Sequence, residues 1–196
     1  MFYKKFPSII FFALLLISYI AGLQPSMAAE CPQKGEVFPS IALPTPKDVH
    51  ARSYLGLKET NHFTISDVKA EIVILEVFSM YCPYCQKEAP LVNDLYNMIN
   101  ESQNIKDKIR IIGVGAGNTE FEVQVFSSTY SIPFPLISDE SFSFHKAIGE
   151  VRTPYFFVIK INPDGSNVII YSKGGTIKAP ETFLELILSE SGLKRR

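Results

Sequence analysis

The hydrophobic period of the chain changes several times after residue 70, which predicts alternating strands and helices. Residues 72–78 are apolar except for Glu76, as expected of a strand buried on both faces. Residues 83–101 have apolar positions at helical spacing, and residues 108–114 form a second apolar run. A strand, a helix and another strand in this order predict a βαβ unit with parallel strands.

A second helix is predicted over residues 119–130, because the segment opens with the Thr-x-x-Glu spacing of a capping box. Its expected buried face includes Phe121, Val125 and Phe126. The remaining pattern predicts a short strand, a helix, two strands joined by a tight turn, and a last helix. These elements are expected at residues 133–137, 142–148, 155–161, 167–171 and 180–192.

Together these elements predict one α/β domain with a central mixed β-sheet and helices on both faces. Hydrophobic residues make up 46% of the 196-residue chain, which suffices for one well-buried core. The net charge of −1 argues against nucleic acid as a partner, because nucleic-acid-binding domains are strongly basic. We expect a monomer.

The first 28 residues have the pattern of a secretory signal peptide. Lysines precede an apolar stretch over residues 9–23, and small residues suit cleavage after Ala28. Alternatively, residues 9–23 stay as an uncleaved membrane anchor, since their length is near the lower limit for crossing a bilayer. In both cases we expect a periplasmic or otherwise extracytoplasmic protein, with an extended lead-in over residues 29–47 and a folded domain over residues 48–196.

Cys82 and Cys85 indicate the chemistry, because they lie where the strand at residues 72–78 leads into a helix. The N–H groups and dipole of a helix N-terminus stabilise a thiolate, so Cys82 is the expected nucleophile. Cys85, one helical turn further on, is placed to form a disulfide with Cys82 and release whatever it has captured. Cys31 is expected to be a bystander on a mobile tail.

The alternative for this cysteine pair is half of a zinc site, which needs two more ligands at comparable spacing. The chain has one further cysteine and three scattered histidines. We therefore expect no metal, and exchange between thiols and disulfides needs no cofactor.

From about residue 35 to the C-terminus the chain resembles the thioredoxin fold, and within it the TlpA/ResA-like thiol-disulfide oxidoreductases of the redoxin/AhpC-TSA superfamily. The resemblance is carried by the lead-in, the segment before the first core strand, the cysteine pair with its surroundings, and a Thr-Pro pair. These segments are residues 35–39, 63–68, 78–90 and 153–154. An inserted helix and strand of the family correspond to residues 115–141.

The resemblance implies that Cys82 and Cys85 exchange with thiols and disulfides of exported proteins, in the reducing direction, for example in cytochrome c maturation. It also implies a membrane electron donor of the DsbD/CcdA type. Phe78 and Tyr81 stand where the family usually has Trp, so aromatic packing is retained. Because the site lacks the His of strongly oxidising DsbA-type proteins, we expect an intermediate or reducing potential.

Two carboxylates are expected to handle protons. Glu76 matches the buried Asp of thioredoxin, and burial raises a carboxyl pKa toward the range that suits a proton shuttle to and from Cys85. The alternative is a structural Glu76 paired with Lys or Arg. Glu88 matches the active-site Glu of the ResA-like group, and its alternative is a solvated surface acid.

Thr153 and Pro154 match the cis-proline position of the family. A cis-proline leaves the backbone of the preceding residue free to pair with an extended substrate. With Pro83 and Tyr84 they form the expected substrate-binding site.

Two other functions are possible from the same residues. A thiol peroxidase of the peroxiredoxin superfamily has a P-x-x-x-T/S-x-x-C pattern, of which Ser79 fits one position, whereas Leu75 stands in place of the Pro. A copper-binding chaperone would use Cys82, Cys85 and His145.

Overall fold

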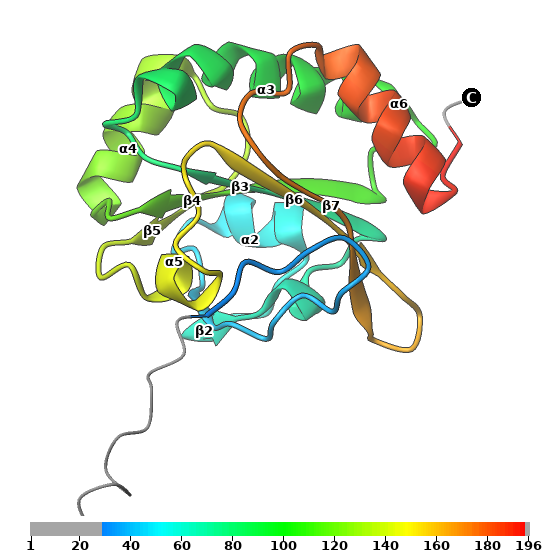
Figure 1. The fold of residues 1–196 in the computed structure, drawn as a ribbon, viewed down its shortest axis with the longest axis horizontal. Coiled ribbons are helices and arrows are strands. Elements are labelled where there is room, and N and C mark those ends of the chain that lie inside the picture. The colour runs from blue at the N-terminus through cyan, green and yellow to red at the C-terminus, as the bar shows by residue number, and fades with distance from the viewer. Residues whose placement is uncertain (1–28, 195–196) are drawn as a thin grey trace, which may run out of the picture.

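The fold is built around a five-stranded mixed β-sheet (Figure 1). A computed structural model of the chain describes residues 29–194. The strands are β3 Ile72–Phe78, β4 Ile109–Ala116, β5 Leu136–Asp139, β6 Tyr155–Ile161 and β7 Asn167–Gly174. Their order in the sheet is β5-β4-β3-β6-β7, with β3, β4 and β5 parallel and β6 antiparallel to both β3 and β7. The predicted α/β fold with a mixed sheet is confirmed.

Helices cover both faces of the sheet (Figure 1). One face carries α3 (Pro83–Glu101), α4 (Glu120–Tyr130) and α6 (Pro180–Ser191), and the other carries α2 (Val49–Leu55) and α5 (Ser143–Ala147). Side chains alternate along a strand, so β3 contributes to two cores. Ile74 packs in the core that includes α3 and α6, whereas Leu75 packs in the core that includes α2 and α5.

The elements around the cysteine pair have the predicted bounds, 72–78 for the strand and 83–101 for the helix. The strand predicted at 133–137 begins only at Leu136, because Pro133 and Pro135 have no N–H to donate to a sheet. The pattern did not reveal several short elements. These are α2, the two-stranded sheet of β1 (Leu43–Pro44) and β2 (His62–Phe63), and the 3₁₀ turn η1 (Ile65–Asp67).

The buried face of α4 differs from the predicted one. Val123 and Phe126 are buried, whereas Phe121 is 72% exposed and Val125 is half-buried. The predicted capping box at Thr119 is present and sets where the helix begins. Positions four and seven residues after this cap then face the sheet, which leaves Phe121 at the surface.

The segment before residue 48 packs along the domain. The Gly35 N–H donates to the Ile169 carbonyl over 2.8 Å, and Phe38 is 2% exposed. The prediction that Cys31 lies on a mobile tail is wrong, because its Sγ is partly buried and lies 3.2 Å from the Tyr155 hydroxyl oxygen.

Residues 1–28, with the predicted signal peptide or anchor, lie outside the described residues. Within residues 29–194, no helix has both the length and the apolar character needed to cross a membrane. The predicted boundaries at residues 28 and 47 stay predictions.

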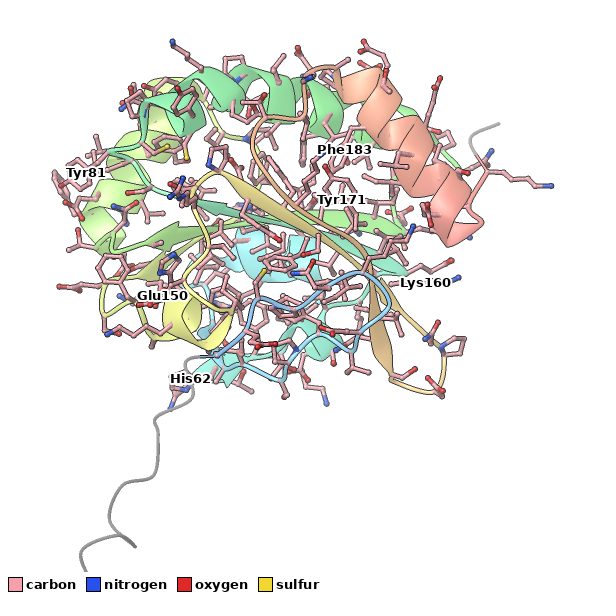
Figure 2. The ribbon with its side chains drawn as sticks, viewed as in Figure 1. His62, Tyr81, Glu150, Lys160, Tyr171 and Phe183 are labelled. Carbon is pink, nitrogen blue, oxygen red and sulfur yellow. The ribbon has the colours of Figure 1, made fainter. Side chains whose placement is uncertain are left out.

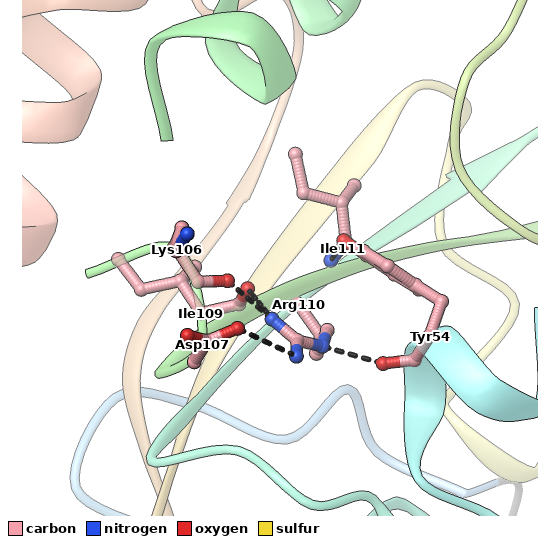
Figure 3. A network of polar contacts seen from close by, with 6 residues as sticks. All are labelled: Tyr54, Lys106, Asp107, Ile109, Arg110 and Ile111. Atoms are coloured by element: carbon pink, nitrogen blue, oxygen red, sulfur yellow. Dashed lines mark hydrogen bonds and ion pairs between the residues drawn. The ribbon is translucent and has the colours of Figure 1, made fainter. Parts of the chain in front are cut away.

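A polar network around Arg110 ties the start of β4 to the end of α2 (Figure 3). The Arg110 side chain donates hydrogen bonds to the carbonyl oxygens of Tyr54 at 2.5 Å, Ile109 at 3.1 Å, and Lys106. Its guanidinium also lies 4.8 Å from the centroid of the Tyr54 ring. Asp107 approaches to 3.8 Å, but its side chain is 79% exposed, so this ion pair contributes little. The contacts to the carbonyls and the ring therefore hold this corner together.

Replacing Arg110 with Met should lower the free energy of unfolding by about 1–3 kcal/mol, because half-buried carbonyls lose their donors. Urea unfolding followed by circular dichroism measures this loss. Asp107→Asn is the matched control, since it removes only the ion pair, and it should cost less than about 0.5 kcal/mol. Equal losses in the two variants would contradict this account.

Candidate functional site

Cys82 lies where the chain leaves β3 and enters α3. It is the N-cap residue of the helix, and Pro83 follows in the first turn, where a missing N–H costs nothing. The Cys82 N–H donates to the Ser79 carbonyl over 3.0 Å and closes the turn. The helix therefore begins at the cysteine pair, as predicted, and both cysteines are free thiols.

The thiol of Cys82 is partly exposed and has a lowered pKa. Partial burial opposes ionisation, but the hydrogen bonds that Thr153, Cys85 and Tyr84 provide outweigh it. The Cys82 Sγ lies 3.4 Å from the Thr153 carbonyl oxygen, so it faces the segment that carries Pro154. A thiolate at this position is accessible to a disulfide that approaches from solvent.

Cys85 has the opposite environment. It is 0% exposed and packs with Phe78 and Ala89. Burial raises the pKa of the Cys85 thiol, and the neighbouring Cys82 and Glu76 raise it further. Cys85 therefore needs a base that removes its proton before it can attack a mixed disulfide.

Glu76 lies within β3, which is buried along its whole length, and is itself 5% exposed. By strand alternation it shares the face of Ile74, which packs against α3. Burial raises the pKa of Glu76 to about 8, and the charges of Glu88 and Cys82 add to this effect. No Lys or Arg in the described part of the chain lies within ion-pair distance of Glu76, so the alternative of a structural ion pair is wrong.

Glu88 is 0% exposed, so the alternative of a solvated surface acid is wrong. Its Oε1 accepts a hydrogen bond from the Ile177 N–H at 2.6 Å, while its buried Oε2 has no partner within the described chain. Burial raises the pKa of Glu88, and the bond from Ile177 opposes this. Glu88 thus joins α3 to the loop after β7.

A groove of about 600 Å³ lies beside Cys82. The peptide bond between Thr153 and Pro154 is cis, as predicted, and both residues line the groove. Tyr84, 66% exposed, lines it too, whereas Pro83 does not. The other walls come from the start of β6 and the end of β7, and the lining residues are Tyr84, Arg152, Thr153, Pro154, Tyr155, Gly174, Gly175 and Thr176. Of the four predicted substrate-binding residues, the groove therefore brings together Tyr84, Thr153 and Pro154.

Asn118 is a site residue that the sequence pattern did not reveal. Its Oδ1 accepts the Met80 N–H at 2.9 Å, and the Gln86 side chain donates to the Met80 carbonyl at 2.8 Å. The hydroxyl of Tyr81, exposed beside α4 in Figure 2, donates to Glu122. These contacts fix the turn before Cys82. The sequence does carry a signal for Asn118, because it is a polar residue that follows β4. Since β3 and β4 are parallel, their ends meet at one edge of the sheet, beside the turn before Cys82.

No group of three potential metal ligands occurs within residues 29–194. His145, the third ligand of the copper alternative, is hydrogen-bonded through Nε2 to the Val151 carbonyl oxygen at 2.8 Å. His62 begins β2, well apart from Tyr81 (Figure 2). The described residues therefore support neither the zinc nor the copper alternative.

Comparison with known proteins gives consistent matches. The sequence model of the AhpC/TSA family matches residues 35–179. The thiol-disulfide oxidoreductase ResA of Halalkalibacterium halodurans is 31% identical over 133 residues, which are 68% of this chain and 72% of that protein. ResA of Bacillus subtilis is 27% identical over 134 residues, or 67% and 70% of the two chains. A structure from Chlorobium tepidum, described as a thiol:disulfide interchange protein DsbE, shares the fold with a TM-score of 0.60 at 19% identity, over 81% of this chain and 98% of that one.

Cys82 should react with iodoacetamide before Cys85, with a thiol pKa below the free value of about 8.5. The reduced Cys31→Ser variant leaves only these two thiols for limited alkylation, and mass spectrometry of the peptides identifies the labelled one. Faster labelling of Cys85 would contradict the assignment of Cys82 as nucleophile.

The raised pKa of Glu76 makes stability depend on pH. Between the ordinary value of 4.5 and about 8, the folded protein keeps a proton that the unfolded chain has lost, so stability falls as pH rises. Glu76→Gln removes this dependence. The free energy of unfolding of the variant, relative to that of wild type, should therefore rise by about 2–4 kcal/mol between pH 5 and pH 8. Urea unfolding of both reduced proteins at the two pH values measures the change. A difference that is constant with pH would mean that Glu76 is ionised in the folded protein.

Proposed function

We propose that this chain, which belongs to the AhpC/TSA family and is a thiol-disulfide oxidoreductase of the ResA type, reduces disulfides of exported proteins outside the cytoplasm. The observation that carries the proposal is the split between an accessible thiol of lowered pKa at Cys82 and a buried thiol of raised pKa at Cys85. A pair of this kind can capture a disulfide with one sulfur and resolve it with the other.

The exchange runs in two steps. The Cys82 thiolate attacks one sulfur of the client disulfide, so that a mixed disulfide forms and the other client sulfur leaves as a thiolate. Cys85 then loses its proton and attacks Cys82, which releases the second client sulfur and leaves a Cys82–Cys85 disulfide. Two electrons have passed to the client.

Glu76 is the proposed acceptor of the Cys85 proton. Its pKa of about 8 lies near working pH, where a carboxyl can both take and return a proton. Glu88 is the second candidate, because it is buried with one oxygen unpartnered within the described residues. The one proton that Glu76 takes from Cys85 passes on to the second client sulfur as it leaves.

The setting of this chemistry is also part of the proposal. The pattern of residues 1–28 supports export, with cleavage or with an anchor at 9–23. A membrane protein of the DsbD/CcdA type would return electrons to the Cys82–Cys85 disulfide, because an oxidising compartment does not keep the pair reduced. Disulfides of apocytochrome c are one client class, and the protein works as a monomer.

The clients can be identified by trapping. Cys85→Ala should accumulate mixed disulfides through Cys82 in cells, because resolution is blocked. Mass spectrometry of the captured proteins should identify exported proteins with paired cysteines, and the matched control Cys82→Ala should capture none of them. Capture of cytoplasmic proteins alone would contradict the proposed location. Consumption of hydrogen peroxide in place of disulfide reduction would favour the peroxidase alternative.

Glu76→Gln should slow resolution of the mixed disulfide by roughly 10- to 100-fold, since the amide cannot accept the Cys85 proton. The slowing should vary with pH across the titration of Glu76. Quenched-flow separation of mixed disulfide and product from pH 5.5 to 8.5 measures the rate. Glu88→Gln, measured beside it, keeps an oxygen that can accept the Ile177 N–H. Equal rates for Glu76→Gln and wild type, with slowing in Glu88→Gln, would transfer the role to Glu88.

A further inference from the structure

The groove beside Cys82 contains a single charged residue among those that line it, Arg152. Its other walls are the aromatic rings of Tyr84 and Tyr155, the ring of Pro154 and the glycines at the end of β7. Arg152 is exposed, and within the described chain its guanidinium takes part in no ion pair and no hydrogen bond with the protein. The groove thus presents one uncompensated positive charge on mostly apolar walls.

Exposed residues of both signs are close to the groove in sequence, and Glu150 precedes Arg152 by two residues. Lys173 directly precedes the glycines that line the groove and Lys178 follows shortly after, and both are exposed. No acidic residue lines the groove. On the other side of Cys82, Glu122 is held by Tyr81 and by the capping box of α4. The charge within the groove is therefore that of Arg152, and it attracts negative charge.

The groove also determines where a client would lie. The Cys82 Sγ is 3.4 Å from the carbonyl oxygen of Thr153, which directly follows Arg152. A segment that extends over Thr153 places its own cysteine against Cys82. Since an extended chain advances about 3.3 Å per residue, the long Arg152 side chain reaches neighbours within about two residues of that cysteine.

We propose that the groove selects client segments that carry Asp or Glu within two residues of the reactive cysteine, beside an apolar side chain. The occupant is an extended segment of a protein, because the apolar walls and the Thr153 backbone before the cis-proline suit a strand-like ligand. Arg152 is then a specificity residue, which pairs with the acidic side chain. This inference rests on the proposed function and names its substrate class.

The test uses reduced protein in single turnover with three peptides, each closed by one disulfide. The peptides share an apolar residue beside the reactive cysteine and differ at one neighbouring position, which is Asp, Asn or Lys. Two electrons pass from the Cys82 and Cys85 thiols to the peptide, so no other reductant is needed. The second-order rate constant for Asp should exceed that for Lys by about 3- to 10-fold at low salt, and 0.5 M salt should shrink the ratio.

Variants assign the preference to one side chain. Arg152→Gln should bring the ratio of Asp to Lys rate constants close to one, and Arg152→Glu should invert it. Lys58→Glu is the matched control, since it makes the same charge change at an exposed residue outside the groove, and it should keep the wild-type ratio. Circular dichroism confirms that each variant is folded.

The outcomes separate the two proposals. If no peptide is reduced, the proposed function fails. If all three are reduced at equal rates, or if Lys58→Glu alters the ratio as much as Arg152→Glu does, the function stands and the selection of acidic clients is overturned. If the peptides react equally but glutathione disulfide reacts in a manner that depends on Arg152, the groove serves a small anionic thiol, and the protein occupant is overturned.

Discussion

The burial of β3 on both faces is the constraint on which the rest of the site depends. All seven residues of this strand are buried, and its partners β4 and β6 are aligned with it almost to the end. The strand therefore cannot shift without moving the turn at Cys82 and the start of α3. Because Glu76 belongs to this strand, the same burial that positions the nucleophile also removes a carboxyl from water.

Burial opposes ionisation of both cysteines, but their thiol pKa values shift in opposite directions because the two thiols differ in access to hydrogen-bond donors. Cys82 stands at a helix N-terminus, where N–H groups outweigh its partial burial, and its thiol pKa falls. Cys85 lies one turn deeper, in an apolar cluster, and its thiol pKa rises. The proposed attacking thiol, Cys82, and the proposed resolving thiol, Cys85, are thus separated by one helical turn. Glu76, the proposed proton acceptor, lies on the same side of the sheet as Cys85, and burial raises the pKa of its carboxyl.

How much of this could be predicted depends on how far apart the contacting residues are in the sequence. The strand at 72–78 and helix at 83–101 were predicted because long apolar runs specify them locally. The exposed Phe121 was predicted wrongly, because the apolar residues of a short helix fit more than one face until its neighbours are known. The contact between Met80 and Asn118 joins residues 38 positions apart, and the contact between Glu88 and Ile177 joins residues 89 positions apart. Only the folded chain brings these residues together. The cysteine pair was found because its spacing is local.

Chemistry and recognition use different parts of the fold. The groups proposed to exchange electrons and protons lie on β3 and in the first turns of α3, where packing leaves little room for change. The groove is formed by Tyr84 of α3 and by residues around the start of β6 and the end of β7, and the exposed Arg152 side chain makes no hydrogen bond or ion pair within the described chain. The two parts adjoin at the contact between Cys82 and Thr153 and at Tyr84, which lies in the first turn of α3 and lines the groove. Client choice can therefore change by substitution of Arg152, which is not among the groups that shift the thiol and carboxyl pKa values.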